Sequence, residues 1–246
     1  MSDPIIRGVI FDLGGTLILP GSWEEANARA LRAALRRRGH AVPEEFVPAL
    51  VAERQARWAA RTGFEETTAD QALRAILDRF ALPAGPADVG DAERAFFVPE
   101  LEEVRPLPGA AAVLARLTRG GLRTALLSNA SSHYFVVECC RRLLFAEFLD
   151  PIVSSAAVGW VKPDARVFQA VLRPWGVPPG AVVMVGDSLP ADIAGAAALG
   201  MRSILLTAVH TPGAPVAGEA GRPDAVAATL AEAAGIIEEW KEARDG

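Results

Sequence analysis

Short runs of apolar residues alternate with amphipathic segments along most of the chain. The apolar runs predict buried strands at residues 5–11, 122–127, 152–154, 181–185 and 203–206, with one more short strand before the last helix. The amphipathic segments predict helices at residues 107–120, 133–144, 163–172, 191–199 and 229–241, and residues 208–224 are predicted to form a loop. Strands that alternate with helices form a parallel sheet covered on both faces, so we expect an α/β fold with a doubly wound, Rossmann-like sheet.

One long stretch breaks this alternation directly after the first strand. Residues 22–105 show helical periodicity and no strand pattern, and they predict helices at 22–39, 43–63, 68–83 and about 91–101. Capping boxes are expected at residues 22–25 and 68–71. The buried face of the first helix is expected to consist of Ala26, Ala30, Leu31, Ala34 and Leu35.

The position of this helical stretch predicts two domains. The α/β core is expected to comprise residues 1–18 and 106–246, and an inserted all-helical cap residues 19–105. Because the insert follows the first strand, it must protrude at the carboxyl edge of the sheet, which is where open α/β sheets bind ligands. The cap can therefore cover a binding crevice.

The composition narrows the class of protein. The chain has 246 residues, of which 51% are hydrophobic and 22% charged, which suits one large globular domain with an insertion. No apolar run approaches the ~18 residues of a membrane span and residues 1–4 lack a leader pattern, so we expect a cytoplasmic protein without membrane contact. A net charge of −5 gives no indication of a nucleic-acid partner. Cys139 and Cys140 are neighbours on a predicted helix, and at least one is expected to be buried.

Four polar stretches lie at or just beyond the predicted strand ends, at residues 12–16, 128–129, 162–164 and 186–192. Carboxylates from separate strands, Asp12 and Asp187, can hold a hard cation such as Mg²⁺. The Ser128 hydroxyl and the Lys162 ammonium can bind the oxygens of an anion. Together these groups predict a site for a phosphorylated ligand.

The order and spacing of these four stretches, with a helical insert after the first, resemble the haloacid dehalogenase superfamily over essentially the whole chain. Most members are phosphatases and other phosphoryl-transfer enzymes that work through an aspartyl intermediate. The resemblance implies that Asp12 is the nucleophile and that Thr16 supports its loop. It also implies that Ser128 and Lys162 bind the transferring phosphoryl group.

The resemblance further implies a Mg²⁺ site and additional phosphate contacts. Asp12, Asp187 and the backbone carbonyl of Gly14 would be metal ligands, and Asp192 would either bind the metal through water or orient the site. Phosphate contacts are expected from Asn129 and from the backbone of the turn at Gly15.

Gly14 departs from the pattern of the family phosphatases. These usually carry an Asp two residues after the nucleophile, which protonates the leaving group and later activates water. Such general acid–base catalysis is worth about 10²–10⁴-fold in rate. Candidates for a general acid that replaces this Asp are Glu24, Glu25, Glu53 and His133.

Three functions remain open on the sequence. The first, which we favour, is a Mg²⁺-dependent hydrolase of a small phosphate monoester. The second is attack on carbon, as in the 2-haloacid dehalogenases, which also lack the second Asp; residues 53–58 resemble their substrate-binding arginine stretch. The third is a weakly active or non-catalytic binding protein that keeps the fold.

The cap is expected to select the substrate, and the protein to be a monomer or homodimer. Arg54, Arg57, Trp58 and Trp23 are candidates to face the crevice, although burial in the cap interior is the favoured place for Trp58.

Overall fold

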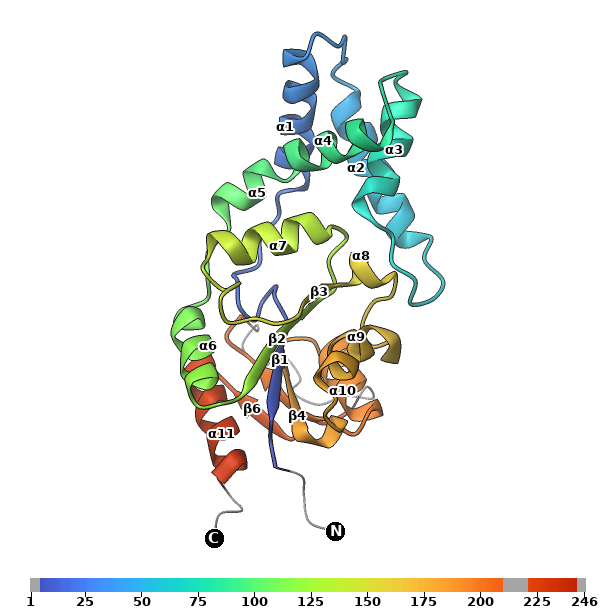
Figure 1. Ribbon diagram of the computed structural model, residues 1–246. Coiled ribbons are helices and arrows are strands. Elements are labelled where there is room, and N and C mark those ends of the chain that lie inside the picture. The colour runs from blue at the N-terminus through green and yellow to red at the C-terminus, as the bar shows by residue number, and fades with distance from the viewer. Residues whose placement is uncertain (1–4, 210–220, 243–246) are drawn as a thin grey trace.

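The computed structural model describes residues 5–209 and 221–242 and contains a six-stranded parallel sheet in the order β3-β2-β1-β4-β5-β6 (Figure 1). The strands are β1 Gly8–Phe11, β2 Arg123–Ser128, β3 Ile152–Ser154, β4 Val182–Gly186, β5 Arg202–Leu206 and β6 Ala225–Ala227. The α/β class and the parallel sheet are therefore confirmed. Most of the predicted loop, together with His210, lies outside the described residues.

The strand order fixes where the site can form. From β1 the chain adds β2 and β3 on one side, and it then crosses back to add β4, β5 and β6 on the other. Phe11 is paired with Leu126 of β2 and with Val185 of β4. Asp12, Ser128 and Asp187 therefore emerge close together, because neighbouring parallel strands end at the same edge. A crevice at this reversal of strand order is the usual ligand site of an open α/β sheet.

Helices cover both faces of the sheet, because successive side chains of a strand point to opposite faces. Val9 and Phe11 pack on one side with α6 Ala110–Arg119, α7 His133–Arg142 and α11 Leu230–Glu242. Ile10 packs on the other side with α9 Ala165–Trp175 and α10 Ala194–Ala198. The short helix α8 Ser155–Val158 follows β3.

The inserted stretch is entirely helical in the structure and forms one end of the molecule (Figure 1). Its helices are α1 Glu24–Arg37, α2 Phe46–Ala59, α3 Ala69–Arg79, α4 Pro86–Phe96 and α5 Val98–Glu103. Their apolar faces share an interior in which Leu31, Phe46, Leu50, Leu73 and Phe96 are fully buried. No helix in the described part of the chain is long and apolar enough to cross a bilayer.

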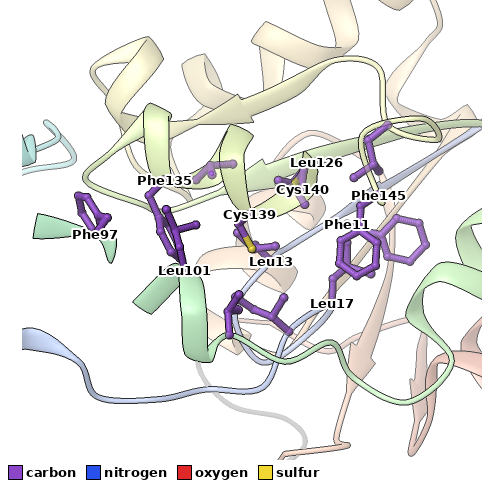
Figure 2. Close-up of a cluster of buried hydrophobic side chains, with 14 of the residues drawn as sticks. Phe11, Leu13, Leu17, Phe97, Leu101, Leu126, Phe135, Cys139, Cys140 and Phe145 are labelled. Carbon is purple, nitrogen blue, oxygen red and sulfur yellow. The ribbon is translucent and has the colours of Figure 1, made fainter. Parts of the chain in front are cut away.

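Helix α5 joins the insert to the core through aromatic packing. The Phe97 ring lies 5.2 Å from the Phe135 ring of α7, measured between centroids. Figure 2 shows Leu101 in the same buried cluster as Cys139. Both cysteines are fully buried, and burial raises the pKa of each thiol to about 12. The predicted buried position of the cysteines is confirmed.

Several local predictions for the insert are wrong. The segment expected as one helix over 91–101 is two helices, because Pro99 has no N–H to donate to the carbonyl four residues before it. The second helix begins at Phe46 rather than at residue 43. The N-cap residues Trp23 and Thr68 make no side-chain capping hydrogen bond, so the two capping boxes do not form.

The buried face of α1 is also rotated from its predicted position. Asn27 and Ala28 are buried with Leu31 and Leu35, whereas Ala26 is exposed. A polar side chain therefore lies on the face that packs against the rest of the protein, and it must find hydrogen-bond partners there.

Gly8 gives a test of the packing beneath the sheet. A Cβ at Gly8 would overlap the Trp175 ring of α9, so we expect Gly8→Ala to lower the free energy of unfolding by about 1–3 kcal/mol. Gly235 in α11 is the matched control: an added Cβ meets nothing there, and Gly235→Ala should stabilise the helix by about 0.5–1 kcal/mol. Urea denaturation measures both, and changes of the same sign would contradict this packing.

Candidate active site

A cavity of about 610 Å³ lies between the carboxyl edge of the sheet and the helical insert. The core contributes Asp12, Ser128, Lys162 and Asp187 to its wall, among others. The insert and the segment leading into it contribute Trp23, Glu24, Arg54, Phe97 and Glu100. The structure thus brings the four predicted polar stretches to one place and sets the insert opposite them.

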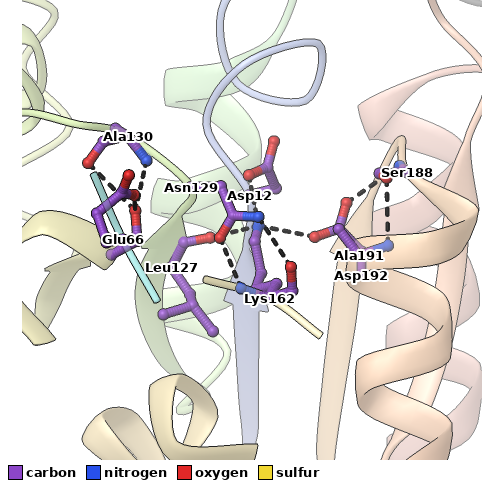
Figure 3. Close-up of polar contacts among 10 residues, drawn as sticks. Asp12, Glu66, Leu127, Asn129, Ala130, Lys162, Ser188, Ala191 and Asp192 are labelled. Carbon is purple, nitrogen blue, oxygen red and sulfur yellow. Dashed lines mark hydrogen bonds and ion pairs between the residues drawn. The ribbon is translucent and has the colours of Figure 1, made fainter. Parts of the chain in front are cut away.

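Lys162 is the centre of the core side of this cavity. Its Nζ donates to Asp12 Oδ1 at 2.6 Å and to the Leu127 carbonyl at 2.7 Å, and it lies 2.7 Å from Asp192 Oδ1 (Figure 3). The residue is only 3% exposed. Burial lowers the pKa of the ammonium, but the charges of Asp12 and Asp192 outweigh burial and raise it. Lys162 therefore stays charged in the interior.

Asn129 holds the backbone of Lys162 in place. Its side-chain amide donates to the Lys162 carbonyl at 3.1 Å, and its Oδ1 accepts the Lys162 N–H at 2.7 Å (Figure 3). Both ends of the amide are used in this way. Asn129 thus positions the lysine. It also lines the cavity, and its contact with a phosphate stays a prediction.

Three carboxylates meet at the floor of the cavity. One oxygen from each of Asp12, Asp187 and Asp192 lies within 4.8 Å of the others. Burial, followed by the negative charge of Asp12, raises the pKa of Asp187 to about 6. Burial also raises the pKa of Asp192, against the opposing charge of Lys162, and its Oδ2 accepts the Ser188 N–H at 3.1 Å. One ammonium faces three carboxylates, which favours the binding of a further cation.

The turn after β1 requires its glycine. Gly15 has φ of +76°, and a Cβ there would overlap the carboxylate of Asp187. Its N–H donates to the Ile18 carbonyl at 2.8 Å and so closes the turn, whereas the sequence predicted that this backbone contacts a phosphate. Gly14, in contrast, is exposed on the cavity wall.

The two predicted hydroxyl groups have different surroundings. Ser128 ends β2 and lines the cavity, where it can meet a ligand. Thr16 is fully buried in the turn, and its Oγ1 has no hydrogen-bond partner among the described residues. Thr16 therefore makes no hydrogen bond to Asp12.

The insert is fastened to the loop that carries Lys162. Val161 N–H donates to the Phe64 carbonyl at 2.8 Å, and Glu66 N–H donates to the Gly159 carbonyl at 3.0 Å. The Glu66 carboxylate also accepts the Ser155 hydroxyl, whose oxygen accepts the Ala130 N–H at 2.9 Å (Figure 3). The insert therefore contacts the site loops directly, away from its two connections to the core.

Two residues on the insert side were missed by the sequence reasoning. Asn27 Nδ2 donates to Glu100 Oε2 at 2.9 Å, and Glu100 N–H donates to Asn27 Oδ1 at 3.3 Å. The spacing of four between Asn27 and Leu31 was the available signal, because it places an amide on the apolar face of α1. Glu100 had no comparable signal.

The proposed substitute acids are mostly occupied elsewhere. Glu24 lines the cavity and forms an ion pair with Arg54. Glu25 pairs with Arg29 and Glu53 with Arg57, and neither carboxylate is part of the wall of the main cavity. His133 is likewise outside this wall, and its Nδ1 lies 3.0 Å from Ser154 Oγ.

A second cavity of about 570 Å³ adjoins the first and shares Glu24, Arg54, Asn129 and Ser131 with it. Arg57 and Trp58 line this second cavity, Trp23 lines the first, and Arg54 lies on the wall of both. Trp58 is 68% exposed, so the expectation that it is buried in the cap interior is wrong.

The sequence profile of the haloacid dehalogenase-like hydrolases matches residues 6–200 of the chain. The chain belongs to this family. Phosphoserine phosphatase of Thermus thermophilus is 31% identical over 214 residues, which cover 82% of this chain and 81% of that protein. Glyceraldehyde 3-phosphate phosphatase of Methanothermobacter thermautotrophicus is 36% identical over 108 residues, 44% of this chain and 47% of that protein. This chain thus spans about half the length of several curated relatives that it matches.

Among solved structures, 2-haloacid dehalogenase of Pseudomonas syringae pv. tomato superposes with a TM-score of 0.72. The two sequences are 24% identical, and the match covers 96% of this chain and all of that one. At this identity the likeness establishes the fold. A phosphatase from Thermococcus onnurineus superposes with a TM-score of 0.62 at 20% identity, over 94% of this chain and 98% of that one. Proteins named as dehalogenases and proteins named as phosphatases therefore share this fold.

The two lysines of the chain allow a matched test of the buried ammonium. Lys162→Met removes the cation from between Asp12 and Asp192, and we expect it to lower the free energy of unfolding by about 3–5 kcal/mol. Lys241 lies on the surface, where it donates to the Gly120 carbonyl, and Lys241→Met should change stability by less than about 0.5 kcal/mol. Urea denaturation of the two variants is the measurement. Equal stabilities would contradict a buried ionic centre.

Proposed function

We propose that the protein is a Mg²⁺-dependent phosphatase of a small phosphate monoester, with Asp12 as the nucleophile. The observation that carries this proposal is the pairing of Asp12 with buried Lys162 at the floor of a cavity that also presents a second carboxylate, Asp187. Lys162 binds Asp12 through Oδ1, which orients the carboxylate and leaves Oδ2 for the substrate.

In this proposal the reaction has two displacements at phosphorus. Asp12 Oδ2 forms a bond to phosphorus while the bond from phosphorus to the leaving oxygen breaks, which gives an aspartyl phosphate. Water then attacks the phosphorus, the bond to Asp12 breaks, and phosphate and the free carboxylate result. Ser128 would bind an oxygen of the transferring group from the end of β2, and Lys162 would balance the negative charge at Asp12.

The donor set at the floor of the cavity fits Mg²⁺. Two carboxylates with few further protein ligands are typical of magnesium sites that bind phosphate, and the excess of carboxylates over ammonium groups here favours a divalent cation. Asp12, Asp187 and the Gly14 carbonyl would hold the ion. Asp192 is in contact with Lys162, so its proposed role is to orient the lysine. When bound, Mg²⁺ would neutralise charge on the phosphoryl oxygens.

The named relatives support a phosphate ester as the substrate. Besides the phosphoserine and glyceraldehyde 3-phosphate phosphatases, they include a ribulose-1,5-bisphosphate 5-phosphatase of Halopiger xanaduensis, 31% identical over 123 residues. All three names describe small phosphate monoesters. Attack on carbon, the dehalogenase alternative, requires no bound cation, so the cluster of Asp12, Asp187 and Asp192, which could hold one, supports phosphoryl transfer.

Hydrolysis of p-nitrophenyl phosphate tests this function. Its leaving group departs without a proton, so the first displacement in this assay requires no general acid. We expect turnover with Mg²⁺, none with EDTA, and a fall to background in Asp12→Asn. Asp78→Asn, an exposed site on α3, should retain wild-type turnover.

Full activity of the Asp12→Asn variant, or turnover that is unaffected by EDTA, would contradict the proposal. An inactive wild-type protein that instead releases halide from 2-haloacids would indicate attack on carbon. Inactivity in both assays would favour a binding protein.

A further inference from the structure

The cavity needs a proton donor that the turn after β1 does not supply. Gly14 has no side chain, and an alkyl phosphate requires protonation of its leaving oxygen. The carboxyl groups that line the main cavity within the described residues are those of Asp12, Glu24, Glu100, Asp187 and Asp192. Four of them already have a partner or a proposed role. Asp12 is the proposed nucleophile and Asp187 a proposed metal ligand. Glu24 is paired with Arg54, and Asp192 is in contact with Lys162. Glu100 remains.

Glu100 is held in place by a buried amide. Asn27 is 1% exposed, and its side chain bonds both the backbone N–H and the Oε2 of Glu100. The aromatic contact of Phe97 with Phe135 anchors the start of the same helix on the core. The carboxyl group of Glu100 therefore has a defined position on the insert wall, with Oε1 outside the amide contact.

The environment of Glu100 favours its protonated form. Burial raises the pKa of its carboxyl group above the ordinary value, and the negative charge of Glu24 adds to this effect. The hydrogen bond from Asn27 and the positive charge of Arg54 oppose burial without cancelling it. A raised pKa is the direction that a general acid requires.

The geometry of the reaction also selects this wall. In phosphoryl transfer the attacking and leaving oxygens lie roughly in line on opposite sides of phosphorus. Asp12 attacks from the core side, so the leaving oxygen points toward the insert. A donor on the insert wall is therefore on the same side of the phosphorus as the leaving oxygen.

We propose that Glu100 is the general acid and base of this site, in place of the side chain absent at Gly14. This inference rests on the proposed phosphatase function. As the Asp12–phosphorus bond forms and the bond to the leaving oxygen breaks, the proton of Glu100 moves to that oxygen and the alcohol departs. The Glu100 carboxylate then takes a proton from the water that attacks the phosphorus, the bond to Asp12 breaks, and the acid is regenerated.

A series of phosphate monoesters with leaving groups from p-nitrophenol to simple alcohols tests this role with Mg²⁺ present. Glu100→Gln should reduce kcat/KM for the alkyl esters by about 10²–10⁴-fold, and for p-nitrophenyl phosphate by a much smaller factor. Its rates should therefore depend more steeply on the pKa of the leaving group than those of the wild type. Glu102→Gln, an exposed glutamate on the same helix, should behave as the wild type does.

Two further variants separate catalysis from structure. Glu100→Asp retains an acid and should keep a shallower dependence on the leaving group than Glu100→Gln. Gly14→Asp combined with Glu100→Gln supplies an acid from the turn after β1, at the position where the family phosphatases usually carry theirs. An added Cβ meets nothing there, and this variant should restore alkyl ester turnover. Partial misfolding of a variant would lower kcat/KM for every ester by the same factor and leave the ratios between esters unchanged.

Equal losses for aryl and alkyl esters in Glu100→Gln, or no loss for either, would overturn the role of Glu100 while leaving the phosphatase function intact. A wild-type protein that hydrolyses no ester of the series would overturn the proposed function, and the role of Glu100 with it. The two failures are therefore distinguishable.

Discussion

The site depends on burying one ammonium group. Isolation of a charge from water is costly, and it is tolerated here because Lys162 Nζ meets oxygens of Asp12, Leu127 and Asp192. These partners come from the end of β1, from β2 and from the segment after β4. The contacts exist together only when the three strands are paired in their observed order. The ion pairs and hydrogen bonds of Lys162 therefore depend on the strand order of the sheet.

The insert supplies what the strand ends cannot. The strand ends bring carboxylates, a hydroxyl and an ammonium to one side of the cavity, and the opposite wall comes from α1, α2 and α5. Contacts of Phe64 and Glu66 with the loop before Lys162 tie this wall to the core. A proton donor at Glu100 would divide the chemistry between the two parts, with the nucleophile on the sheet and the acid on the insert.

Local sequence patterns were sufficient for the sheet and for most of the core side of the site. The strands were predictable because buried parallel strands are short apolar runs, and the parallel order places Asp12, Ser128 and Asp187 at one edge. Helix ends and faces were less predictable. The break before Pro99 follows from the missing proline N–H, which the apolar periodicity does not register, and the burial of Asn27 depends on packing between helices.

The sequence by itself determined the fold class, the helical insert and the chemical types gathered at the crevice, because these follow from periodicity and from the ends of parallel strands. Only the tertiary structure decided which atoms meet. In the folded chain the Asn129 amide hydrogen-bonds the Lys162 backbone, the Gly15 N–H bonds the Ile18 carbonyl of its own turn, and Asn27 bonds Glu100. A polar group bonds whichever partner the packed chain brings within about 3 Å, and for residues far apart in sequence that partner is set by packing.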